Sequence, residues 1–263
     1  MDRTLSAVLA VLAVASVVFL AVFSLSAYIG ITYRHTLSST YEYRASISTD
    51  EPLGNVTLYL PIPAGGSEPL VILEGIGAGK LAGVPPGWNT SLIGTEKITM
   101  LEVTAREMSP SPSAEPYILS ITSRVTGPID TTNAGPGHLL LDASARKGPA
   151  VCPGTGGTTA PDARCDLYES PVYAGFTSPG NVHLGIFISL VGRNAWDVFG
   201  PSSNEYQDGI QVSFSEIAQG WRSGSGMLVT GIGDYGLDPW LPRQAPPARE
   251  GASRQRVAVP TGA

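Results

Sequence analysis

The residue types that most often carry catalysis are few in this sequence, and they lack the spacing of known catalytic motifs. The three histidines, His35, His138 and His183, lie far apart, and none belongs to a zinc-binding HExxH pattern. The run 223–226, Ser-Gly-Ser-Gly, does not have the G-x-S-x-G spacing of a nucleophile elbow. We therefore predict no catalytic residue, no metal site and no cofactor. A hydrolase whose triad or cation site is assembled only by the fold stays an alternative.

The segment 74–81, EGIGAGKL, has glycines and a lysine in an order that suggests a phosphate-binding loop. A Walker A motif needs Gly where Glu74 stands and Ser or Thr where Leu81 stands, so the motif is not met. We interpret the segment as a glycine turn that follows a strand.

Cys152 and Cys165 are the two cysteines of the chain. A disulfide between them would close a loop of about 14 residues and would contribute about 3 kcal/mol of stability. Paired cysteines are typical of proteins in an oxidising compartment. We predict that they are bonded to each other.

Two N-glycosylation sequons are present, Asn55-Val56-Thr57 and Asn89-Thr90-Ser91. A glycan cannot be buried in a sheet interface. The sequons therefore predict that Asn55 and Asn89 are exposed and lie outside the cell.

Aromatic residues are concentrated in the C-terminal half, from Trp196 to Trp240. Together with the Gly, Asn, Ser and Asp between them, they are typical of surfaces that contact proteins or sugars. The alternative is that Trp196 and Trp221 fill the core. The candidate binding residues are Trp196, Tyr206, Trp221, Tyr235 and Trp240.

An apolar N-terminal segment is expected to hold the rest of the chain at a membrane. From Leu5 to Ile31 no residue is charged, and a helix of this length reaches about 40 Å, enough to cross a bilayer. A cleaved signal peptide is the alternative, but its apolar region is usually about 7–15 residues long. We predict a retained signal-anchor helix over 1–34.

The orientation of this helix is not decided by charge alone. Arg3 is offset by Asp2, whereas Arg34, His35 and Arg44 follow the helix, so the bias favours a cytoplasmic C-terminus by one charge. The sequons, the cysteine pair and the length of the domain favour the opposite side. We predict that residues 35–263 are extracytoplasmic.

Alternating apolar and polar residues predict half-buried antiparallel strands after the helix. The clearest are at 41–47, 56–62, 117–124, 182–190 and 210–215. Dense Gly and Pro turns between them, from 31 Gly and 22 Pro, favour a β-sandwich or two sandwiches in series. The fold class is thus an all-β ectodomain preceded by one transmembrane helix.

The same patterns divide the chain into five parts. A Gly, Pro and Thr-rich loop at 146–164, tied by the disulfide, separates a first β half or domain from a second. After Trp240 little is apolar enough to bury, which predicts a disordered tail. The five parts are the anchor helix at 1–34, the first β part at 35–145, the loop at 146–164, the second β part at 165–241 and the tail at 242–263.

The net charge of −6 and the presence of only three lysines argue against nucleic acid as a partner. The chain resembles uncharacterised archaeal membrane-anchored surface proteins with a β-rich ectodomain. The features that carry the resemblance are the anchor, the strand Tyr41-Glu42-Tyr43-Arg44 and the segments 55–61, 88–91, 192–196 and 220–221. That resemblance covers most of the ectodomain and implies no chemistry.

We therefore predict a single-pass surface protein with a structural, adhesive or binding role. Its expected partners are the bilayer and an unknown surface protein or glycan. A pilin-like filament subunit stays an alternative beside the tethered hydrolase, although residues 1–5 lack the basic residue followed by Gly or Ala of a prepilin processing site.

Overall fold

The computed structural model describes residues 3–63, 71–94, 99–111, 115–132, 139, 146–150 and 159–236. It divides after Ile31, so the apolar helix up to that residue and the β domain, Thr32–Tyr235, are two units that we describe separately.

Helix α1 spans Arg3–Thr36. Its segment Ala7–Thr36 contains an 18-residue stretch with a mean hydropathy of 2.9 and is long and apolar enough to cross a membrane or to act as a signal sequence. The hydroxyls of Ser16 and Ser26 donate to the carbonyls of Leu12 and Val22, at 2.8 and 2.9 Å. Because these side chains satisfy their own hydrogen bonds, they add little cost to placing the helix in hydrocarbon.

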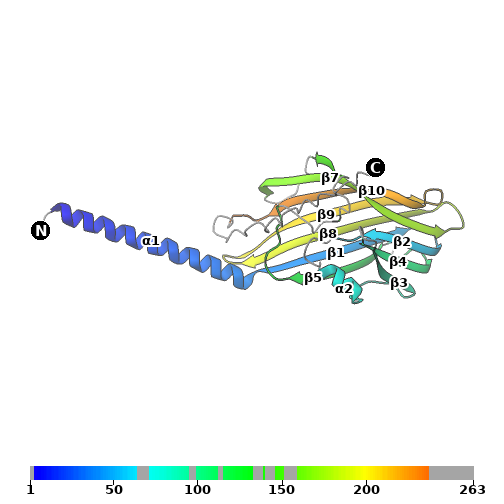
Figure 1. The fold of residues 1–263 in the computed structure, drawn as a ribbon, viewed down its shortest axis with the longest axis horizontal. Helices are drawn as coiled ribbons and strands as arrows, with labels where there is room; N and C mark the ends of the chain where they lie inside the picture. The colour runs from blue at the N-terminus through cyan, green and yellow to red at the C-terminus, as the bar shows by residue number, and fades with distance from the viewer. Residues whose placement is uncertain are drawn as a thin grey trace, which may run out of the picture. The chain divides into compact units, whose positions relative to one another are not determined.

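The β domain is one antiparallel sheet with the strand order β3-β4-β2-β7-β10-β9-β8-β1-β5, and β6 pairs with β7 (Figure 1). The strands are β1 Ser38–Thr49, β2 Leu53–Pro61, β3 Trp88–Gly94, β4 Thr99–Met108, β5 Tyr117–Val125, β6 Arg146–Ala150, β7 Thr159–Thr177, β8 His183–Asp197, β9 Pro201–Ser215 and β10 Gly220–Gly233.

The predicted strands are confirmed, and so is their alternation. In β1 the side chains of Tyr43, Ala45 and Ile47 are buried, while Glu42 before them and Arg44 among them face away from the core. β8 repeats the pattern with Leu184, Ile186, Ile188 and Leu190 inside. One face of the sheet therefore lines a single core and the other faces water.

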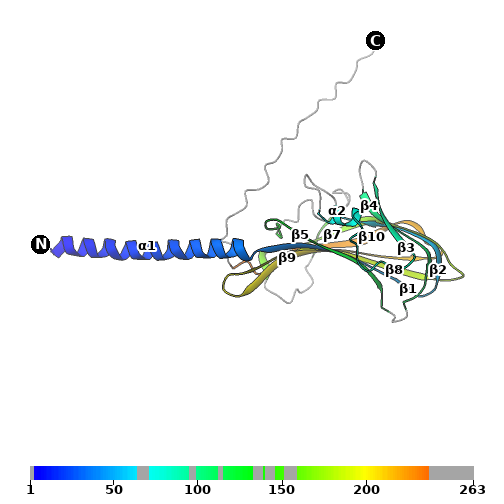
Figure 2. The same cartoon turned by 90° about the horizontal axis from the view of Figure 1, so that it is seen from below.

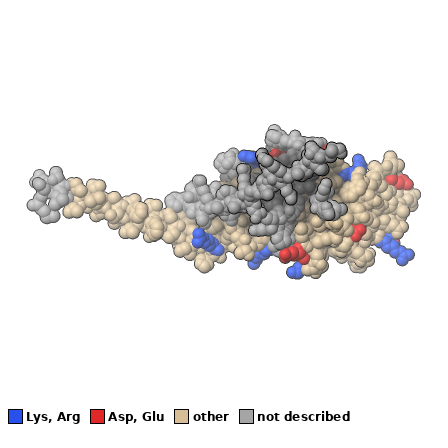
Figure 3. Space-filling view, in the orientation of Figure 1, with Lys and Arg blue, Asp and Glu red and all other residues tan. Residues whose placement is uncertain are grey.

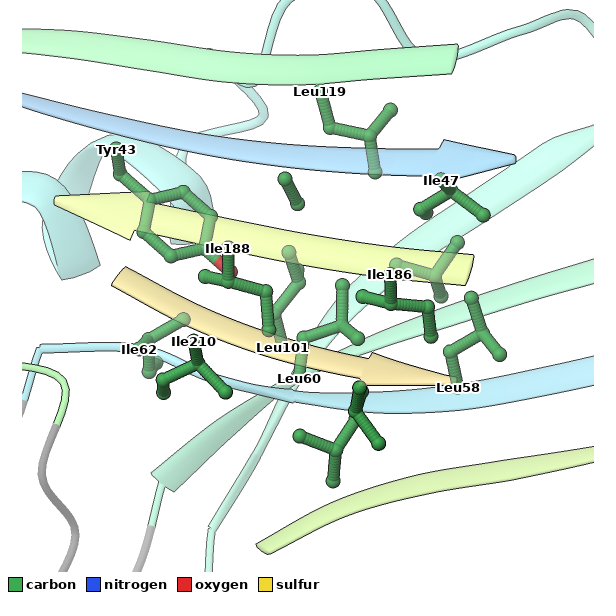
Figure 4. Packing of buried hydrophobic residues seen from close by; sticks show 14 of the residues in the cluster. Tyr43, Ile47, Leu58, Leu60, Ile62, Leu101, Leu119, Ile186, Ile188 and Ile210 are labelled. Atoms are coloured by element: carbon green, nitrogen blue, oxygen red, sulfur yellow. The ribbon is translucent and has the colours of Figure 1, made fainter. Parts of the chain in front are cut away.

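The sheet curls until its two halves face each other (Figure 2). The Tyr43 hydroxyl on β1 donates to the Pro61 carbonyl of β2 at 3.1 Å, although four strands separate β1 from β2 in the sheet order. Figure 4 shows Ile186 and Ile188 of β8 packed with Leu58 and Leu60 of β2 in the shared core.

The predicted β-sandwich is not confirmed, because the described strands form one hydrogen-bonded sheet rather than two. The long strands β7 to β10 carry the sheet from one half to the other. Alternation in a sequence shows which side chains are buried, but not whether the next strand belongs to the same sheet.

A short helix, α2 (Val71–Gly77), corrects the expectation of a glycine turn at 74–81. Ile72 and Ile76 of this helix are buried in the core. Gly75 lies so close to β5 that a Cβ atom there would be 2.4 Å from Cδ1 of Ile121. Ala82 then exchanges backbone hydrogen bonds with Ser120. The helix and this bridge cover part of the free edge of β5, which reduces unwanted strand pairing.

The two predicted β parts alternate within one sheet, since β2 pairs with β7 and β1 with β8. They are therefore halves of one domain. The range 146–164, predicted as a loop, contains β6 and the beginning of β7. The predicted disordered tail, 242–263, lies outside the described residues.

Candidate functional site

The predicted aromatic surface is only partly brought together. Trp196 is 4% exposed and packs edge-on against Tyr33, with ring centroids 5.6 Å apart. Tyr206 is 1% exposed, so neither ring can form an outer contact surface. Tyr235 is half-buried and its hydroxyl is 2.8 Å from that of Thr131. Trp240 lies outside the described residues.

Trp221 is 58% exposed and belongs to a cluster that the sequence analysis did not find. Tyr59 of β2 is the register partner of Tyr173 of β7, and Tyr173 is the partner of Trp221 of β10. The side chains alternate with core residues on each strand, so all three lie on the water-facing side of the sheet. We name Tyr59, Tyr173 and Trp221 the aromatic cluster.

The rings of the aromatic cluster touch one another. Tyr59 and Tyr173 stack with centroids 4.9 Å apart and planes at 25°. The Trp221 ring is 5.4 Å from Tyr173 and 5.9 Å from Tyr59. Because β2 and β10 are two strand spacings apart, roughly 10 Å, the indole must lean across Tyr173 toward Tyr59. Trp221 is 58% exposed, so much of its ring surface is in contact with water.

Neighbouring residues hold the aromatic cluster in place. A Cβ atom at Gly175 would lie 3.0 Å from the Tyr173 hydroxyl, so the absence of a side chain leaves room for the ring. Arg222 follows Trp221 and donates from Nη1 to the Ser213 carbonyl at 2.7 Å. Its guanidinium also lies 5.9 Å from the centroid of the Phe214 ring. These contacts fix the beginning of β10.

Polar residues continue the same row across the sheet. Glu102 of β4 is the register partner of Tyr59, and Ser91 of β3 is the partner of Glu102. The Ser91 hydroxyl donates to Oε2 of Glu102 at 2.6 Å. The row therefore joins an aromatic half to a half that carries a carboxylate and a hydroxyl.

A second row runs beside the first on the same face. Each of its members is two residues away, on its own strand, from a member of the first row. The second row consists of Asn89, Thr104, Thr57 and Gly175, which are paired in register. All are small, and the first three can both donate and accept hydrogen bonds.

Both sequon asparagines are exposed. Asn55 has a positive φ of 50°, a backbone conformation that Asn tolerates better than most residues, at the register irregularity between Gly54 and Thr57. Asn89 belongs to the second polar row. Exposure is what glycosylation requires, while glycosylation itself stays a prediction.

Cys165 is buried on β7. Its expected partner, Cys152, lies outside the described residues, so the disulfide stays a prediction.

The buried carboxylate of Asp208, on the core side of the sheet, already serves the fold. The carboxylate of Asp208 accepts hydrogen bonds from the Tyr168 hydroxyl and, at 2.6 Å, from the backbone N–H of Leu139. Burial raises the pKa of Tyr168 above its usual range, and the nearby Asp208 carboxylate adds to this shift. Asp208 thus ties residue 139 to the sheet.

A hollow lies between α2 and the edge of β5. It has a volume of about 560 Å³ and is lined by Glu74, Lys80 and Arg124 together with hydroxyl side chains of β5. Because acidic and basic side chains both line the hollow, its charge favours neither an anionic nor a cationic ligand.

The arrangement expected of a hydrolase is not present at His183. This residue is exposed. Its backbone N–H donates to the Asp50 carboxylate at 2.7 Å, and its backbone carbonyl accepts from the Asp50 N–H at 3.3 Å. His138 lies outside the described residues. Within the part of the chain that the structure describes, no group of His, Cys, Asp or Glu side chains could hold a metal ion.

Charged side chains are scattered on the face shown in Figure 3, where both signs occur. No protein family, curated protein or solved structure matches this chain.

The sequence did not reveal the aromatic cluster because Tyr59 and Tyr173 lie far from Trp221 in the sequence. A large aromatic residue at a water-facing position of an alternating strand, as at Tyr59, is the signal that could have revealed it.

Proposed function

We propose that this chain is a single-pass, membrane-anchored, extracytoplasmic binding module with a structural or adhesive role at the cell surface, and that it is not an enzyme. The observation that carries the proposal is the aromatic cluster. A Trp that is 58% exposed and held by two Tyr rings is the kind of rigid aromatic group that dominates binding energy at interfaces.

The location rests on three supports. Helix α1 is long and apolar enough to span a bilayer. Asn55 and Asn89 are exposed, as glycosylation outside the cytoplasm requires. The cysteine pair favours the oxidising side. The resemblance to archaeal surface proteins is part of the same proposal.

The location is tested by adding protease to intact cells that make the full chain. The proposal expects loss of the β domain, with an anchored fragment left in the membrane. Protection of the β domain until the membrane is broken would reverse the topology.

The binding role is tested with the full chain in lipid nanodiscs on beads. Fluorescent vesicles prepared from membranes of the producing cells are offered to the wild type, to Trp221→Ala and to the control Phe199→Ala. Phe199 is 68% exposed and lies in the turn between β8 and β9, outside the aromatic cluster. We expect Trp221→Ala to reduce retention by roughly 10-fold or more, since truncating such a residue costs about 2 kcal/mol. Equal retention by the wild type and Trp221→Ala would refute the proposal.

A further inference from the structure

We propose that the ligand of the aromatic cluster is a carbohydrate. One sugar ring stacks on the exposed ring surface of Trp221, and the sugar hydroxyls bond to Glu102 and to the polar row beside it. This inference rests on the proposed function, in which the aromatic cluster is the contact surface.

The first argument is the shape and polarity of the Trp221 indole. The ring makes tilted contacts with Tyr173 and Tyr59, at centroid distances of 5.4 and 5.9 Å, and the residue is 58% exposed, so apolar ring surface is open to water. A pyranose ring has C–H groups on its faces and hydroxyls at its rim. It can therefore cover the apolar indole face while its hydroxyls stay available for hydrogen bonds.

The second argument is the reach from the indole to the carboxylate. The Trp221 centroid is 5.9 Å from that of Tyr59, and Tyr59 is the direct register partner of Glu102. Directly opposed residues on one face have Cβ atoms about 5 Å apart. One or a few sugar rings can therefore contact Trp221 and Glu102 at the same time.

The third argument is the chemistry of the two rows. Apart from Asn89, the predicted glycosylation site, their non-aromatic members are Ser91, Glu102, Thr104, Thr57 and Gly175. None of these is aliphatic, whereas the buried centre of a protein–protein interface is apolar. Hydroxyl, amide and carboxylate groups are the partners that sugar hydroxyls need. The rows therefore favour a carbohydrate over a protein.

The charge of the site refines the ligand class. Glu102 is the single ionisable carboxylate of the two rows, and no Lys or Arg belongs to either row. A sugar carrying carboxylate or sulfate groups would be repelled by Glu102 and would find no Lys or Arg within either row. The expected ligand is a neutral saccharide.

The test uses the full chain in nanodiscs. The probes are linear hexasaccharides of glucose, mannose, galactose and N-acetylglucosamine, together with neutral glycans released from membranes of the producing cells. Binding is followed by calorimetry and by the tryptophan fluorescence that a sugar stacked on Trp221 would change. The variants are Trp221→Ala, Trp221→Phe and Glu102→Gln, with Phe199→Ala as the control.

We expect at least one probe to bind the wild type and Phe199→Ala equally. Trp221→Ala should weaken binding at least 10-fold, Trp221→Phe less, and Glu102→Gln roughly threefold. Each variant is used only after its circular dichroism and melting temperature match the wild type. If Trp221→Ala does not fold, Trp221→Phe replaces it in the test. If Glu102→Gln does not fold, Ser91→Ala replaces it.

The outcomes separate the two proposals. Vesicle retention that depends on Trp221, with no binding of any saccharide, would overturn the carbohydrate assignment and leave the binding role standing with a protein as the occupant. Saccharide binding that is unchanged in Trp221→Ala would place the sugar elsewhere and also overturn the assignment. Loss of both signals in the wild type would reject both proposals.

Discussion

Two tyrosines on the core side of the sheet lie directly over glycines of the neighbouring strand. Tyr206 of β9 is the register partner of Gly192 of β8, and Tyr168 of β7 is the partner of Gly226 of β10. A Cβ atom at either glycine would lie within 2.3 Å of the ring opposite it. Glycine, which is usually unfavourable inside a strand, is required here by the close approach of an aromatic ring.

This arrangement predicts that Gly226→Ala destabilises the protein strongly. The new methyl group would overlap the Tyr168 ring and displace it from Asp208, so we expect a loss of about 2–3 kcal/mol in the free energy of unfolding. The measurement is urea unfolding of the full chain in detergent, followed by tryptophan fluorescence.

The matched control is Gly180→Ala. Gly180 has nothing within 4 Å of its Cβ position, and its φ is not in the left-handed region. We expect a change within about 0.5 kcal/mol. A Gly226→Ala chain as stable as the control would show that the Tyr168 ring is free to move aside.

At the scale of elements, the pairing of β6 with β7 bears on the predicted disulfide. Ala150 is the register partner of Cys165. Cys152 follows Ala150 by two residues in the sequence. A disulfide between Cys152 and Cys165 would cross-link the two ends of the connection between β6 and β7.

We expect the wild type to lose about 3 kcal/mol of stability when a reductant is added, because the cross-link restricts the unfolded chain. Cys152→Ser should lose the same amount and should not respond to the reductant. This variant is preferred to Cys165→Ser, which would bury a hydroxyl group. Intact mass and urea unfolding, with and without dithiothreitol, check the prediction. Equal stability of the oxidised and reduced wild type would contradict it.

At the scale of the whole β domain, the core contains several tyrosines. Burial raises the pKa of Tyr43, Tyr168 and Tyr206 well above the ordinary value of 10. Asp208 adds to the shift for Tyr168, and Tyr41 and Asp208 add to it for Tyr206. The folded state therefore holds these protons more tightly than the unfolded state does.

The sign of the pH dependence follows from this difference. Below about pH 10 the tyrosines are protonated in both states, and their contribution is fully present. Above pH 10 the unfolded state loses protons that the folded state keeps, so stability falls by about 1.4 kcal/mol per pH unit for each tyrosine. We expect the free energy of unfolding to fall steeply from pH 10 to 12.

Tyr43→Phe is the variant that checks the assignment. It loses the hydrogen bond to the Pro61 carbonyl, about 1 kcal/mol at neutral pH, but should reduce the alkaline slope by about a third. Urea unfolding at pH 8, 10, 11 and 12 gives the slope for both chains. An unchanged slope would mean that Tyr43 ionises equally in both states.

The sequence by itself predicts the apolar helix and the positions of five strands, because both depend on local pattern. A run of apolar residues from Leu5 to Ile31 is long enough to cross a bilayer in any fold. Alternation in β1, β2, β5, β8 and β9 gives the buried face of each strand. The exposure of Asn55 and Asn89 also agrees with the expectation from their sequons.

Only the tertiary structure decides which strands lie side by side. Backbone hydrogen bonds between strands do not depend on side-chain identity, so the sequence alone does not show that β2 and β10 flank β7. That order joins Tyr59 and Tyr173 to Trp221, and it also makes one curled sheet where a sandwich was expected. Trp196 and Tyr206 belong to the same aromatic-rich part of the sequence as Trp221. They are buried because their strands place them against Tyr33 and Gly192. Burial of an aromatic ring depends on partners that are distant in the sequence.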